Sequence, residues 1–267
     1  MNSSIAHLLK IFLSFLFMLV IATGCVRAPF PSPKTSGLAP EQPSPAVQIA
    51  AMKYRSDFWK NFQSKLRIDV SGKSARFSSP AIVLVKAPDL VRFETFTPIG
   101  MTAALFVSNP SGPYLLIPSQ KVVYTARRPE SVVRRFLGGV SLSVGFFSHV
   151  LSASVPAEML GTLKGRYQDG LLRLTSKSSA GYFEWQIASG ALVRVFIGSP
   201  RFEWEVVYDP PVPLAGESVP QRIHISSKKW KMEVRVEKMR PAAQFPPGVF
   251  HLPELPGVRQ VVLDGTK

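Results

Sequence analysis

Short apolar runs, rich in Val, Ile, Leu and Phe, dominate the chain from residue 64 onward, and Gly, Pro and Asn-Pro separate them. Runs of this length between turn residues predict β-strands. Charged side chains alternate with others over residues 91–95, so we expect one solvent-exposed and one buried face there. The predicted strands cover residues 64–71, 74–86, 90–97, 102–108, 113–118, 121–125, 163–167, 170–176, 182–188, 191–197, 202–208, 220–227 and 230–239.

Helical periodicity occurs at the start of this region and again in its middle. The first predicted helix covers residues 46–61, with one apolar stripe: Val47, Ala51, Tyr54, Phe58 and Phe62. A second helical stretch begins at residues 129–130 and stops at Gly138 and Gly139. A third follows, with Val144, Phe147, Val150 and Leu151 on one side.

Together these elements predict a mainly β domain of ten or more antiparallel strands with two helices inserted near the middle. A single sheet of that size curls, and partial or full barrel closure is the usual outcome. The two helices would cap the open end of the curled sheet as a lid. The expected architecture is therefore an incomplete β-barrel with a helical lid, which is the shape of a container.

The first 25 residues carry a different signal. One base, Lys10, precedes an apolar run of about 11 residues, which is shorter than the roughly 20 of a membrane-spanning helix. Ala22, Thr23 and Gly24 then lead to Cys25. This pattern resembles the lipobox of bacterial lipoproteins, which implies cleavage before Cys25 and diacylglycerol and N-acyl chains on that residue. The alternative is an uncleaved signal anchor.

Cys25 is the only cysteine, so no internal disulfide or thiolate metal site is possible. Val26 stands where an aspartate would retain an enterobacterial lipoprotein at the inner membrane. The resemblance therefore implies a location on the periplasmic face of the outer membrane. Six prolines follow within residues 26–46, a composition typical of a tether. The predicted organisation is a signal peptide (1–24), a tether (25–46), the folded domain (47–240) and a proline-rich C-terminal extension (241–267) that crosses the sheet.

The formal net charge of +15 suggests an anionic partner. An exported protein rarely meets nucleic acid, so anionic lipid head groups, lipopolysaccharide phosphates or an acidic protein are better candidates. The alternative is that basic pairs such as Arg127 with Arg128 and Arg134 with Arg135 form ordinary solvated faces. Hydrophobic residues make up 46% of the chain, so the domain must bury a large apolar surface or present an apolar groove.

The sequence offers little for catalysis. Its four histidines, His7, His149, His224 and His251, show no metal-binding spacing, and no Gly-x-Ser-x-Gly is present. The acids show no paired-carboxylate pattern. We therefore expect a non-enzymatic protein without a metal, and we expect His149 and His224 to be surface residues.

Three segments, in order and at similar spacing, resemble the LolB family of outer-membrane lipoprotein receptors. They are residues 89–106 with their Pro98-Ile99-Gly100 turn, the Gly-rich break and helix of residues 137–156, and the strand pair of residues 220–236. The resemblance covers roughly residues 47–239. Ser152, Ala153 and Ser154 replace the Trp and Gly of the family's lid segment, which is compatible with an uncharacterised LolA/LolB-like branch.

The resemblance implies a membrane-insertion loop at Ile99, with Met101 two positions on. The alternative is a plain hairpin turn whose Ile99 folds back onto the sheet. It also implies an apolar cavity and lid, for which ordinary core is the alternative. The predicted cavity and lid residues are Val91, Phe93, Leu105, Leu116, Phe136, Leu137, Phe147 and Leu151.

The function that this implies is to accept acyl chains of lipoproteins from a periplasmic LolA-like carrier and to help insert them into the outer membrane. The basic pairs near the lid would steer an acidic carrier. Phospholipid or glycolipid are alternative cargoes. A second hypothesis is a structural or assembly lipoprotein, whose sheet is a packed core and whose surface binds an envelope complex. We expect a monomer in either case.

Overall fold

The fold is described from a computed structural model. It describes residues 43–72, 76–129, 131–132, 144–178, 181–199, 202–214, 217–228, 230–242, 244–252 and 256–263, which all belong to one compact unit spanning Pro43–Lys267. The predicted signal peptide, Cys25, Phe136, Leu137 and the pair Arg134 with Arg135 lie outside these residues. The predictions made for them stay predictions, as do the predicted domain boundaries.

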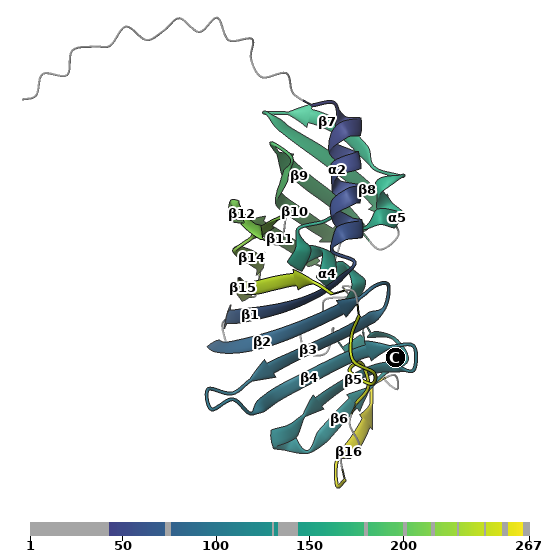
Figure 1. Cartoon of the computed structure of the whole chain (residues 1–267), viewed down its shortest axis with the longest axis vertical. Coiled ribbons are helices and arrows are strands. Elements are labelled where there is room, and N and C mark those ends of the chain that lie inside the picture. Colours follow the sequence, from purple (N-terminus) through teal and green to yellow (C-terminus); the bar gives the residue numbers. More distant parts are fainter. Residues whose placement is uncertain are drawn as a thin grey trace, which may run out of the picture. The chain divides into compact units, whose positions relative to one another are not determined.

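One 14-stranded sheet dominates the unit, in the order β16-β6-β5-β4-β3-β2-β1-β15-β14-β11-β10-β9-β8-β7 (Figure 1). Its first strands are β1 (Asn61–Gly72), β2 (Arg76–Lys86), β3 (Leu90–Phe96), β4 (Thr102–Asn109), β5 (Gly112–Ile117) and β6 (Val122–Thr125). Its later strands are β7 (Lys164–Gln168), β8 (Leu171–Ser178), β9 (Gly181–Ala188), β10 (Ala191–Ser199), β11 (Phe202–Tyr208), β14 (Arg222–Ser227), β15 (Trp230–Pro241) and β16 (Arg259–Val262).

The remaining elements are short. A hairpin of β12 (Pro211–Leu214) and β13 (Glu217–Pro220) forms a separate two-stranded sheet. The helices are α2 (Pro45–Phe58), α4 (Val144–Ser152) and α5 (Ala157–Leu160), with a 3-10 turn η1 (Pro118–Gln120). Pro129, Ser131 and Val132 are also helical.

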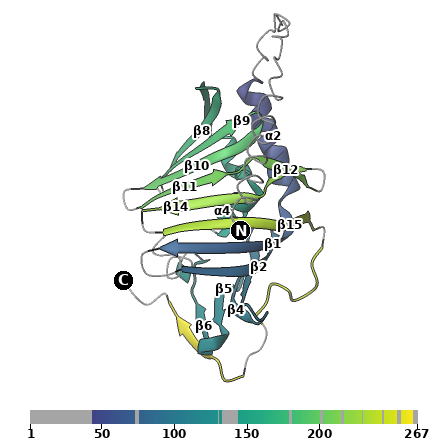
Figure 2. The same ribbon diagram turned by 90° about the vertical axis from the view of Figure 1, so that its left-hand side faces the viewer.

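The sheet curls strongly but stays open, with β16 and β7 as its two edges (Figure 2). Its strands are antiparallel neighbours except at β16, which pairs in parallel with β6. β15, from the C-terminal part of the domain, pairs with β1 from its N-terminal part, so the first strand and one of the last lie side by side in the middle of the sheet. The predicted curled antiparallel sheet is confirmed, and no closed barrel forms. We call β2–β6 the N-terminal wing, and β8–β11 with β14 the C-terminal wing.

Tight turns join most neighbouring strands, as their sequences predict. At Asp169 and Gly170 both backbone φ angles are positive, 53° and 76°. Two consecutive positive φ angles match the twist of antiparallel strands in two-residue hairpins, where Asp-Gly is a preferred pair. The turn therefore fixes the register of β7 against β8.

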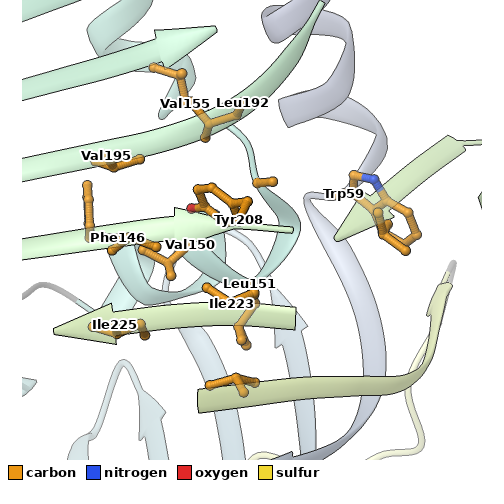
Figure 3. Close-up of a cluster of buried hydrophobic side chains, with 14 of the residues drawn as sticks. Trp59, Phe146, Val150, Leu151, Val155, Leu192, Val195, Tyr208, Ile223 and Ile225 are labelled. Carbon is orange, nitrogen blue, oxygen red and sulfur yellow. The ribbon is translucent and has the colours of Figure 1, made fainter. Parts of the chain in front are cut away.

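The inner face of the sheet carries the helices and the main core. In the C-terminal wing, Leu172, Leu174, Trp185, Ile187 and Val195 are at most 2% exposed. Figure 3 shows how side chains of α4, including Val150 and Leu151, pack against β10, β11 and β14. Burying this apolar surface is the main stabilising contribution to the fold.

Helix α2 is present as predicted, but the prediction of its buried stripe is wrong. The face turned to the sheet carries Gln48, Met52 and Ser56, followed by Trp59, whereas Val47 is 58% and Tyr54 61% exposed. Met52 and Trp59 lie seven residues apart, and both are at most 2% exposed. Burial of Met52 and of the cap residue Trp59 therefore orients the helix on the sheet.

The outer face of the N-terminal wing is also apolar, and the C-terminal segment (residues 244–252 and 256–263) covers it. Phe250, 6% exposed, packs over Leu84, Val107 and Val123. Asn109 Nδ2 donates to the carbonyl of Phe250 at 2.7 Å, which fixes the segment in place. The prediction that the tail crosses the sheet is confirmed.

The expectation of a solvent-exposed face on β3 is wrong. Arg92 and Glu94 point to the outer face, form an ion pair at 2.8 Å and are only 21% and 16% exposed at their side chains. Arg92 Nη1 also donates to the carbonyl of Val249 at 3.1 Å, and Thr102 Oγ1 donates to Glu94 at 2.6 Å. The charges are therefore covered by the C-terminal segment and satisfied by partners.

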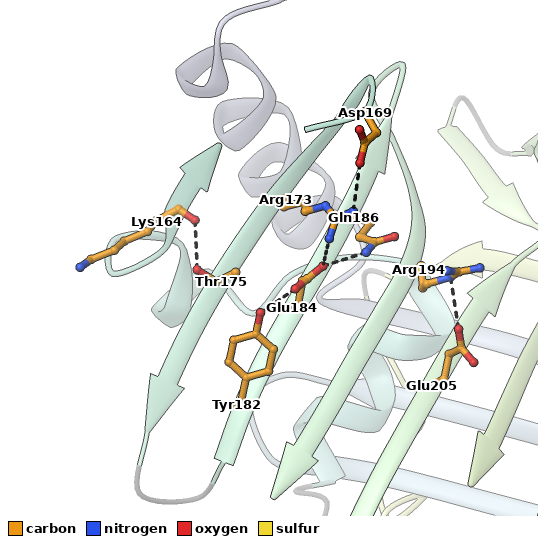
Figure 4. A network of polar contacts seen from close by, with 9 residues as sticks. All are labelled: Lys164, Asp169, Arg173, Thr175, Tyr182, Glu184, Gln186, Arg194 and Glu205. Atoms are coloured by element: carbon orange, nitrogen blue, oxygen red, sulfur yellow. Dashed lines mark hydrogen bonds and ion pairs between the residues drawn. The ribbon is translucent and has the colours of Figure 1, made fainter. Parts of the chain in front are cut away.

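The outer face of the C-terminal wing is polar (Figure 4). Glu184 accepts hydrogen bonds from Tyr182 at 2.6 Å and Gln186 at 2.7 Å, and lies 3.3 Å from Arg173. Burial alone would raise the pKa of Glu184, but the two hydrogen bonds and the Arg173 charge outweigh it and lower that pKa. Burial and the hydrogen bond to Glu184 raise the pKa of Tyr182 to about 12. This network is a structural ion-pair cluster on a solvated face.

Candidate functional site

A half-buried apolar surface lies on the inner face of the N-terminal wing. Pairing of Phe93 with Phe106 and of Leu115 with Tyr124 puts all four side chains on that face. Residues on this face that are neither buried nor fully exposed are Phe93, Ala104, Phe106, Ile117 and Tyr124. Large apolar side chains left half exposed in a row are the kind of surface that binds an apolar ligand.

Helix α4 borders this surface on one side. The Phe147 ring packs edge-to-face on Phe93, with 6.0 Å between ring centroids. On another side of the same helix turn, Phe146 is 6% exposed, and its ring centroid lies 5.5 Å from that of Phe183. The helix therefore turns one phenylalanine into the core and the other toward the N-terminal wing.

Val132 borders the surface on the opposite side. It is 1% exposed and packs with Leu115 and Ala126. The chain between Val132 and Val144 thus begins and ends on the inner face of the sheet. This is the stretch that the sequence predicts as the lid, and its residues 133–143 lie outside the described part of the chain.

Arg55 of α2 fixes the C-terminal end of α4. Its Nε donates to the carbonyls of Ser152 and Ala153, both at 3.0 Å, and its Nη2 donates to the carbonyl of Ser218. Ala153 has a φ of 48°, the left-handed conformation that often ends a helix. A guanidinium at this point satisfies carbonyls that lack helical partners and complements the helix dipole.

A polar cluster follows the same helix end. His149 Nδ1 lies 2.8 Å from Ser154 Oγ, and Ser152 Oγ lies 2.8 Å from the same atom. Burial lowers the pKa of His149, while the charge of Glu158 acts in the opposite direction. The expectation that His149 is a surface residue is met only in part, because the residue is half-buried and its ring is in hydrogen-bond contact with Ser154.

The structure brings only part of the predicted cavity set together. Val91, Phe93, Phe147 and Leu151 belong to the inner-face cluster, with Val91 and Leu151 in its solid core. Leu105 and Leu116 pair with each other on the outer face and pack under the C-terminal segment. The prediction that they line the same cavity is wrong, since neighbouring residues on a strand point to opposite faces.

The β3–β4 turn presents its predicted residues to solvent: Ile99 is 78% and Met101 60% exposed. The amide of Gly100 donates to the carbonyl of Thr97 at 2.9 Å, and that of Thr97 to the carbonyl of Met101 at 2.8 Å. Gly100 has a φ of 83°, as expected of a three-residue hairpin loop. Ile99 therefore projects from a fixed turn and does not fold back onto the sheet.

Sequence reasoning missed Phe106, Phe146 and Tyr124. Phe106 follows Leu105 in an uninterrupted apolar run, so alternation gave no basis for assigning either to a face. Among the described residues, no group of three His, Cys, Asp or Glu is placed to hold a metal ion. No helix in that part of the chain is long and apolar enough to cross a membrane.

Comparison with known proteins gives a fold but no close relative. No family model and no curated protein matches the chain. A LolA superfamily protein from Nitrosomonas europaea superposes with a TM-score of 0.53 at 14% identity, covering 77% of this chain and 96% of that protein. A DUF1329 family protein from Desulfovibrio piger gives 0.54 at 7% identity, covering 77% and 96%.

A protein domain named for outer-membrane lipoprotein sorting, from Vibrio parahaemolyticus, gives a TM-score of 0.51 at 12% identity, covering 77% of this chain and 95% of the domain. The three similarities agree on a LolA-like fold, namely a large curled open sheet with few helices. At these identities the similarity concerns the fold, and the function has to be argued from the site.

Proposed function

We propose that this protein binds acyl chains of lipids or lipoproteins on the inner face of its N-terminal wing. The observation that carries the proposal is the half-buried row of Phe93, Phe106 and Tyr124, bordered by Phe147 of α4. The chemistry required is burial of hydrocarbon, for which aromatic and aliphatic side chains suffice. The proposal therefore includes no catalytic step.

Energetics favour a direct hand-off of cargo. Burying an acyl chain contributes up to about 0.8 kcal/mol per CH₂, so a chain of about 15 carbons gains roughly 12 kcal/mol. Two or three such chains would exceed the practical ceiling of about 18–21 kcal/mol for noncovalent binding. Cargo therefore passes from one apolar surface directly to another. A LolB-like receptor, which accepts lipoproteins from a LolA-like carrier, is the specific form of this proposal.

Lipid attachment at Cys25 belongs to the same proposal. An acyl anchor followed by a proline-rich tether would hold the apolar surface beside the periplasmic face of the outer membrane. A Cys25→Ala variant should then leave the membrane fraction. Variant protein that stays with membranes after a high-salt wash would contradict the anchor.

Mass spectrometry of co-purifying lipid tests the binding proposal. We expect acyl lipids with the full chain purified in mild detergent, and a several-fold decrease for a Phe93→Ser/Phe106→Ser double variant. Tyr54→Ser is the matched control, because Tyr54 is an exposed aromatic residue of α2 outside the surface. Equal lipid content in all three proteins would contradict the proposal.

A structural or assembly role is the second candidate, and α2 is the observation that favours it. Its outward stripe, which includes Val47 at 58% and Tyr54 at 61% exposure, is suited to contact another protein. Cross-linking through this stripe in cells distinguishes the two candidates. A recovered partner together with unchanged lipid content in the double variant would favour assembly.

A further inference from the structure

One row of side chains crosses the outer face of four strands near one end of the sheet. Ser71 of β1 pairs with Arg76 of β2 on one side and with Lys231 of β15 on the other. Lys231 pairs in turn with Ser226 of β14. Paired residues point to the same face, so two cations and two hydroxyl groups are presented together.

This row lies in a groove of about 570 Å³ over β2, β1, β15 and β14. The acids of the groove are already paired, since Arg235 lies 2.6 Å from Glu233 and 3.6 Å from Asp69. Among the described residues, the side chains of Arg76 and Lys231 have no hydrogen-bond or ion-pair partner. The groove therefore offers two uncommitted cations to an anion.

The spacing of the row suits one phosphate. Arg76 and Lys231 are separated by one strand, and adjacent strands lie about 4.8 Å apart. Their backbones are thus about 10 Å apart, a span that two long side chains can close around a single anion. The hydroxyl groups of Ser71 and Ser226 can donate to the same oxygens.

Exposed apolar side chains stand at the same end of the sheet. Ser79 Oγ donates to the carbonyl of Phe96 at 2.8 Å, which ties β2 to the end of β3. The start of β2, which carries Arg76 and Phe77, and the β3–β4 turn lie at the same end of the sheet (Figure 1). Phe77 pairs with Val70, so at this end it stands on the face opposite to Arg76. Phe77 is 50%, Ile99 78% and Met101 60% exposed. We call Arg76, Lys231, Phe77, Ile99 and Met101 the hairpin rim.

We propose that the hairpin rim docks on a membrane surface and holds an anionic lipid head group between Arg76 and Lys231. A soluble anion would need the cations but not the apolar side chains beside them. A bilayer of anionic lipid matches both, with phosphate for the groove and hydrocarbon for Phe77, Ile99 and Met101. This proposal rests on the proposed function in one respect, that the protein works at a lipid surface.

The test uses the full chain, purified in mild detergent and reconstituted in vesicles with brominated acyl chains. A tryptophan placed by Ile99→Trp reports contact with the hydrocarbon by quenching, measured as the difference from the parent chain with its four native tryptophans, and Met101→Trp is the second reporter. We expect several-fold stronger quenching in vesicles containing phosphatidylglycerol than in phosphatidylcholine alone. Adding Arg76→Glu/Lys231→Glu should remove most of this quenching. Each basic residue near an anionic membrane changes the population of the membrane-bound state about fivefold.

Lys60→Glu/Lys86→Glu is the matched control, since it makes the same charge change at exposed residues of the opposite sheet end. It should leave the quenching unchanged. Equal quenching in the two kinds of vesicle, or no effect of the Arg76/Lys231 variant, would overturn the proposal. Loss of quenching on adding inorganic phosphate at constant ionic strength would also overturn it, in favour of a soluble anion. Lipid co-purification is unaffected by any of these outcomes, so failure here is distinguishable from failure of the proposed function.

Discussion

The inner faces of the two wings differ although both are apolar. In the C-terminal wing Trp185, Leu172 and Leu174 are at most 1% exposed beneath the helices. In the N-terminal wing Phe93, Phe106 and Tyr124 stay half exposed. Helices α2, α4 and α5 contribute Met52, Val150, Leu151 and Leu160 to the core, and Phe147 of α4 packs on Phe93 at the border of the half-buried row.

The difference separates the two roles that an apolar sheet face can serve. A face filled by helix side chains stabilises the fold, because its hydrocarbon is removed from water permanently. A face left half exposed still has hydrocarbon in contact with water, so a ligand that covers it gains the free energy of burying that surface. The covered outer face of the N-terminal wing fits the same division, since the C-terminal segment packs on the side of the sheet opposite the half-buried row.

Trp185→Ala should produce the largest loss of stability. Removing this 1% exposed side chain leaves a cavity and should lower the free energy of unfolding by about 3–5 kcal/mol. Phe106→Ala, on the other wing, should lower it by about 1 kcal/mol, since the residue is half exposed. Urea unfolding measures both, and equal losses would remove the distinction between the wings.

Phe250→Ala tests the support from behind. The residue is 6% exposed, and its loss should cost about 3 kcal/mol and loosen the segment from β2–β6. Hydrogen exchange should then increase at residues 245–252 and in β4. Unchanged protection there would show that the segment is not needed to hold the wing.

Arg55→Met should have a smaller effect, confined to the helices. It keeps the length of the side chain but leaves the carbonyls of Ser152, Ala153 and Ser218 without their charged donor. Hydrogen bonds to charged groups contribute about 1.5–3 kcal/mol, so we expect a loss of about 2 kcal/mol. Faster exchange of the α4 amides than of the β10 amides would confirm that the loss is local.

His149 should give the smallest effect, a pH dependence of stability. Burial lowers its pKa in the folded state, so near and below pH 6.5 the unfolded chain binds more protons. Stability should therefore fall as the pH drops through the unfolded pKa. Thermal unfolding between pH 7.5 and 5.5 should show a flatter profile for His149→Gln than for the parent or a His224→Gln control. If thermal stability changed with pH in His149→Gln as steeply as in the parent, His149 would be ruled out as the source of the pH dependence.

The sequence predicted the sheet well because turn residues and β-branched runs are local signals. All 13 predicted strands have a counterpart, from β1 to β11 and then β14 and β15. The hairpin of β12 and β13 was missed, since Pro211 and Pro213 argue against a strand unless it stands apart from the main sheet. β16 was missed because its pairing with β6 depends on a contact across more than a hundred residues.

The site was harder to predict than the sheet. Val91, Phe93, Phe147 and Leu151 share one cluster on the inner side of the sheet, whereas Leu105 and Leu116 lie on the outer face. β4 and β5 carry apolar side chains on both faces, so these strands lack the alternation that would assign a side chain to a face. The covering C-terminal segment is far away in the sequence, so no local pattern contains this information.

Photo-cross-linking of a diazirine-bearing fatty acid to the full chain tests the central claim most directly. After irradiation and digestion, mass spectrometry locates each adduct. We predict adducts on the inner face of the N-terminal wing, at or next to Phe93, Phe106, Tyr124 and Phe147, and their loss in Phe93→Ser/Phe106→Ser. Adducts confined to the outward stripe of α2 or to the hairpin rim, with none on that inner face, would contradict the account.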